Sequence, residues 1–419
     1  MVRRVEEVST PTHNLTYVRD NDMPNFQLSE EQLEIKRAVR EFCEKEFKPE
    51  LALELDRKEE YPIELYRKAA QLGFTTIHFP QEYGGQGYGT LEMCLVVEEM
   101  CRADPSLGVA ISAGVFGSDL ILEYGTQEQK EKYLPKLCKG EYISAAAFTE
   151  PNHGSDITKL DTVATKYGNE WWINGTKTFI TNAPIADFII VLAQTDTRVR
   201  PTYRGQTLFV IDKGTPGLEV TKLSNKMGIR CSVTGEVKLD NVKVTDWHIV
   251  GQLNRGFYHT IEFLDASRVA VAAQAVGMAQ GAWEIAFKYA KQRVTFGVPI
   301  IQHQLIGCGL AEIATKIEAA RLLTYKAAWL VDQYREQAKK TGEKKMDPTI
   351  PMLTSMAKLY ASRIAVESTD FAIQVLGGYG YMADYRVEKY HRDAKITEIY
   401  EGTSEIQKLT ILQYLLRLY

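Results

Sequence analysis

The stretch Ile399-Tyr400-Glu401-Gly402-Thr403-Ser404 sets a single carboxylate between an apolar, aromatic flank and a turn of small residues. Burial of the two residues before Glu401 would leave its charged form poorly solvated, which raises the pKa of a carboxyl group toward neutrality. Gly402 would let another molecule approach the backbone closely. This arrangement is typical of a catalytic base. Taken alone, the hexapeptide favours a helix start, with a hydroxyl residue as N-cap and Glu401 as a surface acid. The rest of the chain decides between these interpretations.

Composition limits the classes of protein that the chain can belong to. Its 419 residues are 45% hydrophobic, which is enough for two or three domains. With 50 basic and 54 acidic residues and a net charge of −4, the chain offers no electrostatic attraction to nucleic acid or to an anionic membrane. The six cysteines have no C-x-x-C or Cys/His spacing, so we expect neither a metal site nor disulfides, and a reducing cytoplasmic location. The longest apolar tract, 269–283, is too short to span a bilayer.

The first part of the chain has helical periodicity. Residues 1–25 lack the apolar core of a signal peptide and are expected to form an N-terminal extension. Residues 26–141 are predicted to form an α-helical domain, in which Ser29 and Gln32 make a capping box and apolar residues follow at helical spacing until Pro49. Further helices are expected over residues 62–73, 91–101, 107–124 and 126–137.

The periodicity changes twice along the rest of the chain. Residues 142–254 contain short β-branched or aromatic segments separated by turns, which predicts an antiparallel β domain. Its strands are expected over 143–148, 162–167, 171–173, 187–193, 207–211 and 237–239. From 255 to 419 the helical period returns, and the segments 257–292, 302–337, 351–375 and 404–419 are long enough to form a four-helix bundle. Residues 339–345 are expected to form a solvated loop.

Two motifs in the β region are the most specific signals. They are Thr149-Glu150-Pro151-Asn152-His153-Gly154-Ser155-Asp156 and Phe179-Ile180-Thr181-Asn182. Together with the domain order, they resemble the T-E-P-x-x-G-S-D and W-I-T-N motifs of the acyl-CoA dehydrogenase family. The resemblance covers nearly everything after Phe26. It implies an α+β multidomain fold with an N-terminal α-helical domain, a middle antiparallel β-barrel-like domain and a C-terminal four-helix bundle.

The resemblance implies that these motifs hold FAD. Phe148 and Thr149 would supply donors to the flavin, and Ser155 would face the CoA side. The Phe179 ring would pack on the flavin where the family usually has tryptophan, so a hydrogen bond from an indole N–H is lost. The Thr181 hydroxyl would meet flavin N5. Without the resemblance, an aromatic-Ile-Thr strand would be read as part of a hydrophobic core.

Two segments of the bundle resemble those that reach the diphosphate of a flavin bound mainly by another subunit. They are Arg293-Val294-Thr295-Phe296-Gly297 with His303-Gln304, and Gln374-Val375-Leu376-Gly377-Gly378. A guanidinium offers paired donors to a diphosphate, and glycines expose backbone N–H groups. Read alone, Arg293 would be a surface arginine and His303 a structural histidine. The predicted flavin contacts are Phe148, Thr149, Ser155, Phe179, Ile180, Thr181, Arg293, Thr295, Phe296, His303, Gln304, Gln374, Val375, Gly377, Gly378, Thr403, Ser404 and Glu405.

A third set of residues concerns the substrate. Asp265-Ala266-Ser267-Arg268 resembles the segment that contacts the CoA thioester arm, although Asp265 and Arg268 are also spaced for an intrahelical ion pair. Ser267 stands where the isovaleryl branch of the family carries its base as glutamate, which leaves Glu401 as the base. Gly108 stands where the glutaryl branch has an arginine, which disfavours a dicarboxylic substrate, and Gln413 replaces a frequent arginine near the CoA. The predicted substrate contacts are Ser155, Asp265, Arg268, Tyr400 and Gly402.

The activity implied by the resemblance is α,β-dehydrogenation of an acyl-CoA thioester to the trans-2-enoyl-CoA. Glu401 would take the α-proton, flavin N5 would accept the β-hydride, and an electron-transferring flavoprotein would remove the electrons. The family also implies a homotetramer built as a dimer of dimers. An acyl-CoA oxidase that uses oxygen shares every motif and is the alternative enzyme. A DNA-binding flavoprotein of the same fold is the alternative from another class, and it would be expected to show a basic patch that this sequence lacks.

Overall fold

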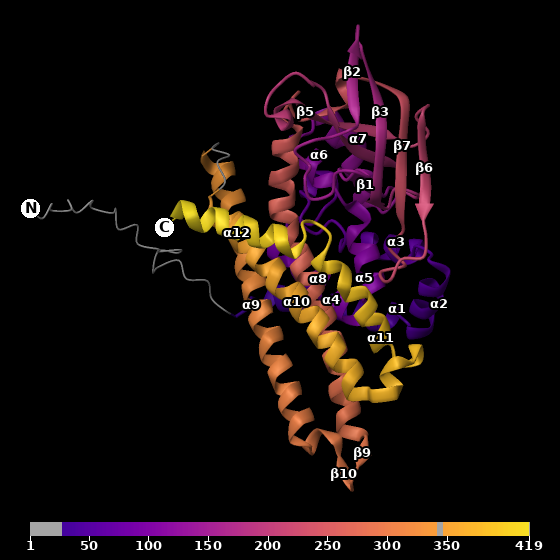
Figure 1. The fold of residues 1–419 in the computed structure, drawn as a ribbon, viewed down its shortest axis with the longest axis vertical. Helices are drawn as coiled ribbons and strands as arrows, with labels where there is room; N and C mark the ends of the chain where they lie inside the picture. Colours follow the sequence, from indigo (N-terminus) through magenta and orange to yellow (C-terminus); the bar gives the residue numbers. More distant parts are fainter. Residues whose placement is uncertain (1–26, 342–346, 419) are drawn as a thin grey trace, which may run out of the picture.

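The protein consists of a helical region, a β-sheet and a bundle of long helices, in that order along the chain. A computed structural model describes residues 27–341 and 347–418. In Figure 1 the sheet lies at one end of the molecule and the bundle extends to the other. The predicted fold class is thereby confirmed. The predicted extension over residues 1–25 lies outside the described residues.

Seven α-helices form most of the N-terminal region that the structure describes. They are α1 (Glu30–Glu46), α2 (Pro49–Lys58), α3 (Ile63–Gln71), α4 (Thr90–Ala103), α5 (Pro105–Ser112), α6 (Ser118–Tyr124) and α7 (Gln127–Cys138). The predicted capping box is present at α1, where the backbone N–H groups of Ser29 and Gln32 each donate to the other's side chain. The helix α2 was not predicted, because Pro49 was taken as a stop although proline also favours the first turn of a helix.

The apolar stretch Pro105–Tyr124 is divided between α5 and α6. Gly117 interrupts it with a φ of 87°, and a Cβ on this glycine would lie 2.5 Å from the Cβ of Ala146. A single helix over this stretch was therefore a wrong expectation, because the chain must turn where it meets the sheet. Within the described residues, this stretch alone is long and apolar enough to cross a membrane by length and composition, and 72% of its apolar window is buried inside the fold.

The middle region is one eight-stranded sheet with the order β6-β7-β3-β2-β4-β5-β8, and β1 pairs with β4. Its strands are β1 (Ser144–Ala147), β2 (Val163–Tyr167), β3 (Glu170–Thr181), β4 (Phe188–Gln194), β5 (Gln206–Asp212), β6 (Leu218–Leu223), β7 (Thr234–Thr245) and β8 (Ile249–Val250). Most pairs are antiparallel, as expected, whereas β4 pairs in parallel with β1 and β2. The strand β6 was not predicted, because its exposed alternation of polar residues carries little hydrophobic signal.

The bundle contains α8 (Gly256–Gln292), α9 (Gln304–Thr341), α10 (Thr349–Leu376), α11 (Val387–Ala394) and α12 (Ser404–Leu418). Its core is rich in alanine, including Ala272, Ala273, Ala357 and Ala361, which lets the long helices approach closely. A hairpin of β9 (Val294–Thr295) and β10 (Val298–Pro299) joins α8 to α9 and projects at the tip opposite the sheet (Figure 1). The helix α9 continues through Thr341, so the expected loop is wrong for residues 339–341, and the rest of the predicted loop lies outside the described residues.

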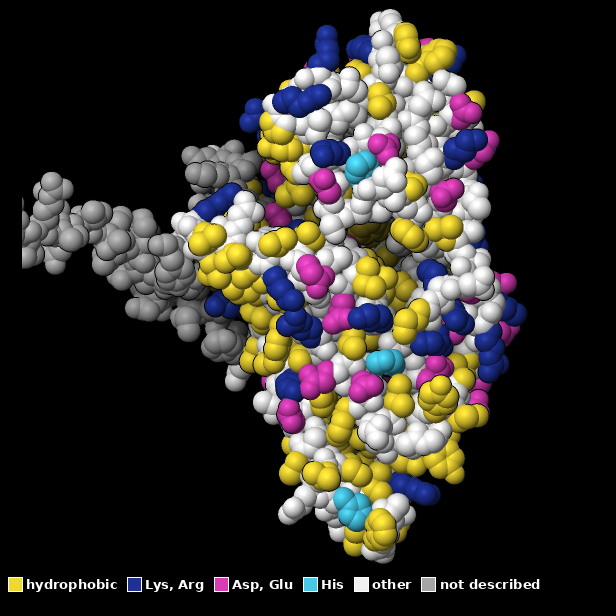
Figure 2. All heavy atoms as spheres, in the orientation of Figure 1, with side chains coloured by type: hydrophobic (Ala, Val, Ile, Leu, Met, Phe, Trp, Pro, Cys, Tyr) yellow, Lys and Arg dark blue, Asp and Glu magenta, His cyan; other side chains and the backbone are white. Residues whose placement is uncertain are grey.

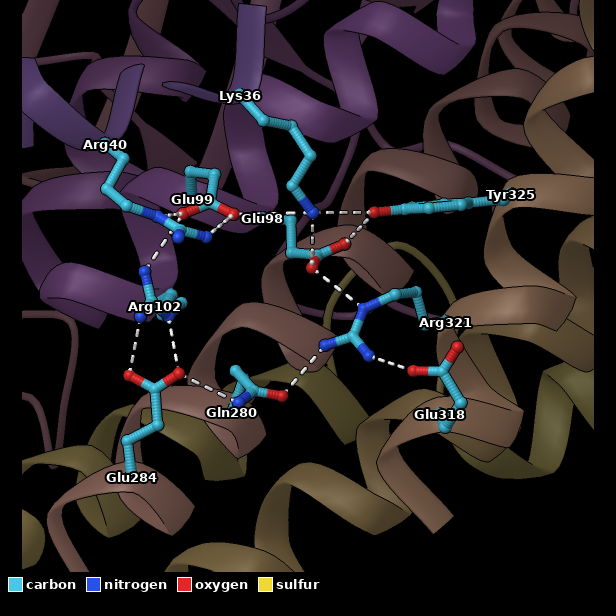
Figure 3. Close-up of polar contacts among 10 residues, drawn as sticks. All are labelled: Lys36, Arg40, Glu98, Glu99, Arg102, Gln280, Glu284, Glu318, Arg321 and Tyr325. Carbon is cyan, nitrogen blue, oxygen red and sulfur yellow. Dashed lines mark hydrogen bonds and ion pairs between the residues drawn. The ribbon is translucent and has the colours of Figure 1, made fainter. Parts of the chain in front are cut away.

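A network of charged residues fastens the N-terminal helices to the bundle (Figure 3). Glu98 and Glu99 of α4 are almost fully buried, at 1% and 2% exposure. Glu98 accepts hydrogen bonds from Arg321 (3.0 Å) and Tyr325 (2.7 Å) of α9. Glu99 is bound by the guanidinium of Arg40 on α1 at 3.0 and 3.1 Å. Buried carboxylates need such partners, because an unpaired buried charge is strongly destabilising. The network therefore fixes α1, α4 and α9 relative to one another.

Candidate active site

A cavity of about 770 Å³ lies where the N-terminal helices, the sheet and the bundle meet. One wall is apolar and includes Met93, Val97, Met100 and Val109 from α4 and α5. Another wall comes from strands β1 and β3 and the residues beside them, and a third comes from α8 and from the turn before α12. A concave, largely apolar space with a few polar groups is the usual form of a binding site for a small molecule.

Glu401 enters this cavity from a turn with unusual backbone geometry. Glu401 and Gly402 both have left-handed backbones, with φ of 52° and 93°. Such a conformation is unfavourable for a residue with a side chain, and it is found where surrounding contacts enforce it. The hydroxyl of Thr403 accepts a hydrogen bond from the Ile406 N–H at 3.3 Å and so caps α12. The helix-start interpretation is therefore correct for Thr403, but Glu401 lines the cavity instead of the outer surface.

The surroundings of the Glu401 carboxyl group raise its pKa. Burial is the largest cause, while a hydrogen bond from Ser267 and the positive charges of Lys358 and Arg268 act in the opposite direction. The Ser267 hydroxyl lies 2.5 Å from Glu401 Oε2. A carboxyl group with a raised pKa is a better proton acceptor once it is ionised, which suits a general base. The raised pKa predicted from the hexapeptide is thus present, but not wholly for the predicted reason: Ile399 is 50% exposed, so the burial of Glu401 does not come from both flanking residues.

The backbone of the same turn offers donors to the cavity. Within the described residues, the N–H groups of Glu401 and Gly402 donate to no protein acceptor. The carbonyl groups of these two residues instead accept hydrogen bonds from the side-chain amide of Gln407. Free backbone donors beside a carboxylate can stabilise negative charge that develops on an oxygen atom.

The strand that carries Phe179 is irregular at that residue. The register between β3 and β7 shifts between Lys177 and Ile180, and Phe179 has a φ of 58°. A bulge of this kind turns a side chain out of the normal alternation of a strand. The Phe179 ring is 71% exposed and lines the cavity, together with Phe148, Thr149, Ile180 and Thr181. An exposed aromatic face next to hydroxyl groups fits a planar, polar ring system.

A second group of predicted flavin residues lies far from this cavity. Arg293, Thr295 and Phe296 belong to the β9–β10 region, which Figure 1 places at the opposite end from the sheet. Phe296 is 97% exposed, and Thr295 bonds His303 at 3.0 Å. Figure 2 shows hydrophobic side chains gathered at this end of the molecule. A single chain therefore does not bring the two groups of predicted flavin residues together.

The glycine turn after α10 has room for a ligand. Gly377 has a φ of 59°, and a Cβ built on Gly377 or Gly378 would meet no atom within 4 Å. These glycines follow Gln374 and Val375, which belong to the last turn of α10. Open space around glycine backbone is what an approaching diphosphate requires.

The family is settled by comparison with known proteins. Models described as the N-terminal, middle and C-terminal domains of acyl-CoA dehydrogenase match residues 29–141, 145–242 and 254–416. The chain belongs to the acyl-CoA dehydrogenase family. Members of this family are flavoprotein oxidoreductases, and the predicted family is thereby confirmed.

Individual relatives match over almost their whole length. A short-chain specific acyl-CoA dehydrogenase of Clostridium acetobutylicum is 42% identical, over 92% of this chain and 98% of the relative. A subunit of the caffeyl-CoA reductase–Etf complex of Acetobacterium woodii is 38% identical, over 93% and 99%. The structure of butyryl-CoA dehydrogenase from Megasphaera elsdenii superposes with a TM-score of 0.86 at 38% identity, covering 94% of this chain and all of that one.

The remaining predicted site residues of this acyl-CoA dehydrogenase family member lie beside the cavity. Asp265 and Arg268 form a buried ion pair, with Arg268 also 3.4 Å from Ser355, and neither lines the cavity. The ion-pair alternative is thus what the structure contains, and contact with CoA stays a prediction. Ser155 is exposed outside the wall, and Ser404 and Glu405 begin α12 next to the turn.

Three functional candidates were missed in the sequence. Gln407 and Lys358 donate to the backbone carbonyls of the turn at Glu401 and Gly402, and Gln274 accepts a hydrogen bond from the Tyr400 hydroxyl on the cavity wall. Lys358 could have been found, because it falls on the buried face of α10 among Thr354, Ala357 and Ala361. A lysine at a core position of a helix is rare unless it has a partner.

One cluster resembles a metal site but is already satisfied. Ligand atoms of Glu150, His153 and Asp161 lie within 4.8 Å of one another. The Glu150 carboxylate is bound by Lys177 at 2.8 Å and accepts the backbone N–H groups of Asp161 and Thr162. Lys177 also donates to the Phe148 carbonyl at 3.1 Å. Lys177 therefore links Glu150 to the backbone of Phe148, which lines the cavity.

Proposed function

We propose that the chain is an FAD-dependent acyl-CoA dehydrogenase with Glu401 as its base. The observation that carries this proposal is that the Glu401 carboxyl group and the Phe179 and Thr181 side chains line one cavity. A proton acceptor and a place for a planar redox cofactor are the two parts that removal of adjacent hydrogens requires. The membership of the family supports the same assignment.

The residues of the turn supply the proton chemistry. Ionised Glu401 would remove the α-proton of the thioester, and the Ser267 hydroxyl at 2.5 Å would keep the carboxylate oriented. The free N–H of Glu401 would donate to the thioester carbonyl oxygen, which stabilises the negative charge that develops as the proton leaves. FAD, when bound, supplies the acceptor for the β-hydride at its N5 atom.

The two separated groups of residues support a flavin site shared between subunits. Phe148, Thr149, Phe179 and Thr181 would hold the ring system in the cavity, whereas Arg293 and the Gly377-Gly378 turn would bind the diphosphate of a partner's FAD. The exposed Phe296 at the end of the bundle is consistent with a surface that another subunit covers. We propose the homotetramer, as a dimer of dimers, on this ground.

A short acyl chain is the substrate class that we propose. The Tyr400 hydroxyl donates to the Gln274 side chain, and both residues line the cavity beside Glu401. The relatives named for short-chain acyl-CoA and butyryl-CoA support the same class. The relative named as part of an Etf complex supports an electron-transferring flavoprotein as the electron acceptor.

One titration tests the proposed function. The purified protein, with its flavin, is mixed anaerobically with butyryl-, octanoyl- or palmitoyl-CoA, and the oxidised flavin absorbance is followed. We expect bleaching that is fastest with butyryl-CoA, and reoxidation by electron-transferring flavoprotein but slowly by oxygen. Rapid reoxidation by oxygen would identify an oxidase instead. Absence of bleaching with all acyl-CoAs would contradict the proposal.

A further inference from the structure

Lys358 of α10 is a buried lysine with an unusual partner. Within the described residues, three lysines have a fully buried side chain and a relative exposure of 0%, namely Lys177, Lys358 and Lys389. Lys177 pairs with Glu150, and Lys389 pairs with Asp104 and Asp393. Lys358 forms no salt bridge with any described carboxylate, and its ammonium donates at 2.7 Å to the backbone carbonyl of Gly402. A buried ammonium with one neutral hydrogen-bond acceptor destabilises the fold, so the presence of Lys358 at this position points to a role other than packing.

The acceptor belongs to the turn that presents Glu401. The left-handed conformation of both Glu401 and Gly402 needs contacts that enforce it. Their two carbonyl groups receive such contacts from the side opposite the cavity. Gln407 Nε2 donates to the Glu401 carbonyl at 3.1 Å and to the Gly402 carbonyl at 2.9 Å, and Lys358 adds the charged donor on Gly402. Of the two donors, Lys358 alone comes from another helix, so it ties the turn to the bundle.

We propose that Lys358 is a positioning residue, which fixes the Gly402 carbonyl and thereby holds the Glu401 carboxyl group and N–H toward the substrate. This inference rests on the proposed function of Glu401 as the base. A charge-assisted hydrogen bond is shorter and stronger than a neutral one, and it suits a turn that must not relax during proton transfer. The ammonium also places a positive charge near the base without contacting substrate.

The electrostatic surroundings agree with this role. Burial lowers the pKa of Lys358 to about 8, and Glu401 is the main group that opposes this shift. The charged groups that act on Glu401 are Lys358, Arg268 and Asp119, of which the two cations favour its ionised form. Loss of the Lys358 charge would therefore shift Glu401 further toward its protonated form.

The test compares Lys358→Met, which keeps the length of the side chain but cannot donate, with Lys358→Gln, which can donate as a neutral amide. The matched control is Lys389→Met, which removes another fully buried ammonium away from the cavity. Flavin reduction by butyryl-CoA is measured anaerobically over a range of pH. For Lys358→Met we expect a limiting rate that is about 10- to 100-fold lower, with a half-saturating butyryl-CoA concentration near that of the wild type. Its pH midpoint should lie higher, and Lys358→Gln should recover part of the rate.

A purely structural role gives a different result. In that case Lys358→Met would lose thermal stability as the Lys389→Met control does, while rate per flavin and pH midpoint stay at the wild-type values, and the proposal is overturned. If Lys358→Met does not fold, Lys358→Gln carries the same comparison. A crystal structure of the variant provides a readout besides activity: we expect the Gly402 carbonyl to rotate and Glu401 to leave its left-handed conformation. Wild-type protein that none of the acyl-CoAs can reduce would contradict the proposed function alone, and the crystal structure would still decide the role of Lys358.

Discussion

The Ser267 hydroxyl donates a 2.5 Å hydrogen bond to the Glu401 carboxylate, although the two residues are 134 positions apart in the chain. Ser267 comes from the middle of α8, and Glu401 from the turn that precedes α12. A donor of this kind stabilises the charged form of a carboxyl group. Another branch of the family carries its base at this position as glutamate. In this chain Ser267 instead supplies a hydrogen bond that stabilises the ionised form of Glu401.

Replacing Ser267 with alanine is expected to raise the pH needed for catalysis. Burial already holds the pKa of Glu401 above its ordinary value, and the Ser267 hydrogen bond opposes that shift. Only the ionised carboxylate can accept the α-proton, so flavin reduction should accelerate as pH rises through this pKa. Without the hydroxyl the pKa rises further, and the midpoint should move to higher pH. The pH midpoint is measured by stopped-flow reduction of the flavin by acyl-CoA over a range of pH. A midpoint that moves to lower pH, or does not move, would refute the role of the Ser267 hydroxyl in stabilising ionised Glu401.

Glu401→Gln should abolish chemistry while preserving binding. The amide keeps the shape of the side chain but has no basic lone pair to accept the proton. Loss of a general base costs about 10²–10⁴-fold in rate, and the flavin content should stay near the wild-type value. The control is Glu398→Gln, a nearby glutamate whose carboxylate binds Lys395. Reduction of Glu401→Gln within tenfold of the wild-type rate would remove Glu401 as the base.

Arg293→Ala should release FAD and weaken the oligomer together. Arg293 is exposed at the end of the bundle, away from its own cavity, and a guanidinium there would pair with the diphosphate of another subunit's flavin. Arg198→Ala is a suitable control, because the Arg198 side chain is 92% exposed in a loop of the β region. Flavin content and sedimentation velocity are measured on both variants. Unchanged flavin affinity in Arg293→Ala would argue against a shared site.

Lys389→Met should destabilise the fold strongly. The Lys389 ammonium contacts Asp104 at 2.8 and 3.0 Å and Asp393 at 2.9 Å, and all three residues are buried. Burial lowers the pKa of Lys389, but the two carboxylates outweigh this effect and hold the pKa above its usual value. Removal of the cation leaves two buried carboxylates without compensation, which costs about 3–5 kcal/mol in the free energy of unfolding.

Urea denaturation measures this loss. The comparison is with Lys395→Met. Lys395 and Glu398 form a partly exposed ion pair, in which the lysine side chain is 48% exposed, so this substitution should change the free energy of unfolding by about 1 kcal/mol or less. If the two substitutions lowered the free energy of unfolding equally, burial of Lys389 and its two carboxylates would not add to the effect of losing the ion pairs.

The order of the three regions was predictable because the spacing of hydrophobic residues changes from helical to strand-like and back to helical along the chain. The long helices and the buried strands β4 and β5 carry strong signals, and the capping box of Ser29 and Gln32 marks the start of α1. Boundaries that depend on contacts with another region were not predictable. Gly117 breaks the stretch between α5 and α6 because the sheet lies against it, which a local pattern cannot reveal. The exposed strand β6 exists because β7 pairs with it.

The candidate site was predictable where a motif is contiguous. The raised pKa of Glu401 was expected from its own hexapeptide, and the cavity position of Phe179 and Thr181 was expected from the resemblance of their short motif to the family, whereas the residues alone predicted a core strand. The partners of the turn were not predictable, because Lys358 and Ser267 reach it from α10 and α8 across the bundle. The sequence marks Lys358 only as a lysine at a core position of a helix and does not reveal what it binds. The ion pair of Asp265 and Arg268 was one of the two alternatives that their i,i+3 spacing offered, and contact of these residues with CoA stays a prediction.

The distance between the β9–β10 hairpin and the cavity of the same chain has a genetic consequence. If each flavin is completed by the neighbouring subunit, a dimer of one Arg293→Ala chain and one Glu401→Gln chain contains one site with both wild-type residues and one site with neither. Two variants that are inactive alone would then complement each other on co-expression and recover up to half of the wild-type activity per dimer. Sites confined to single chains would recover none, because every cavity would carry one of the two defects.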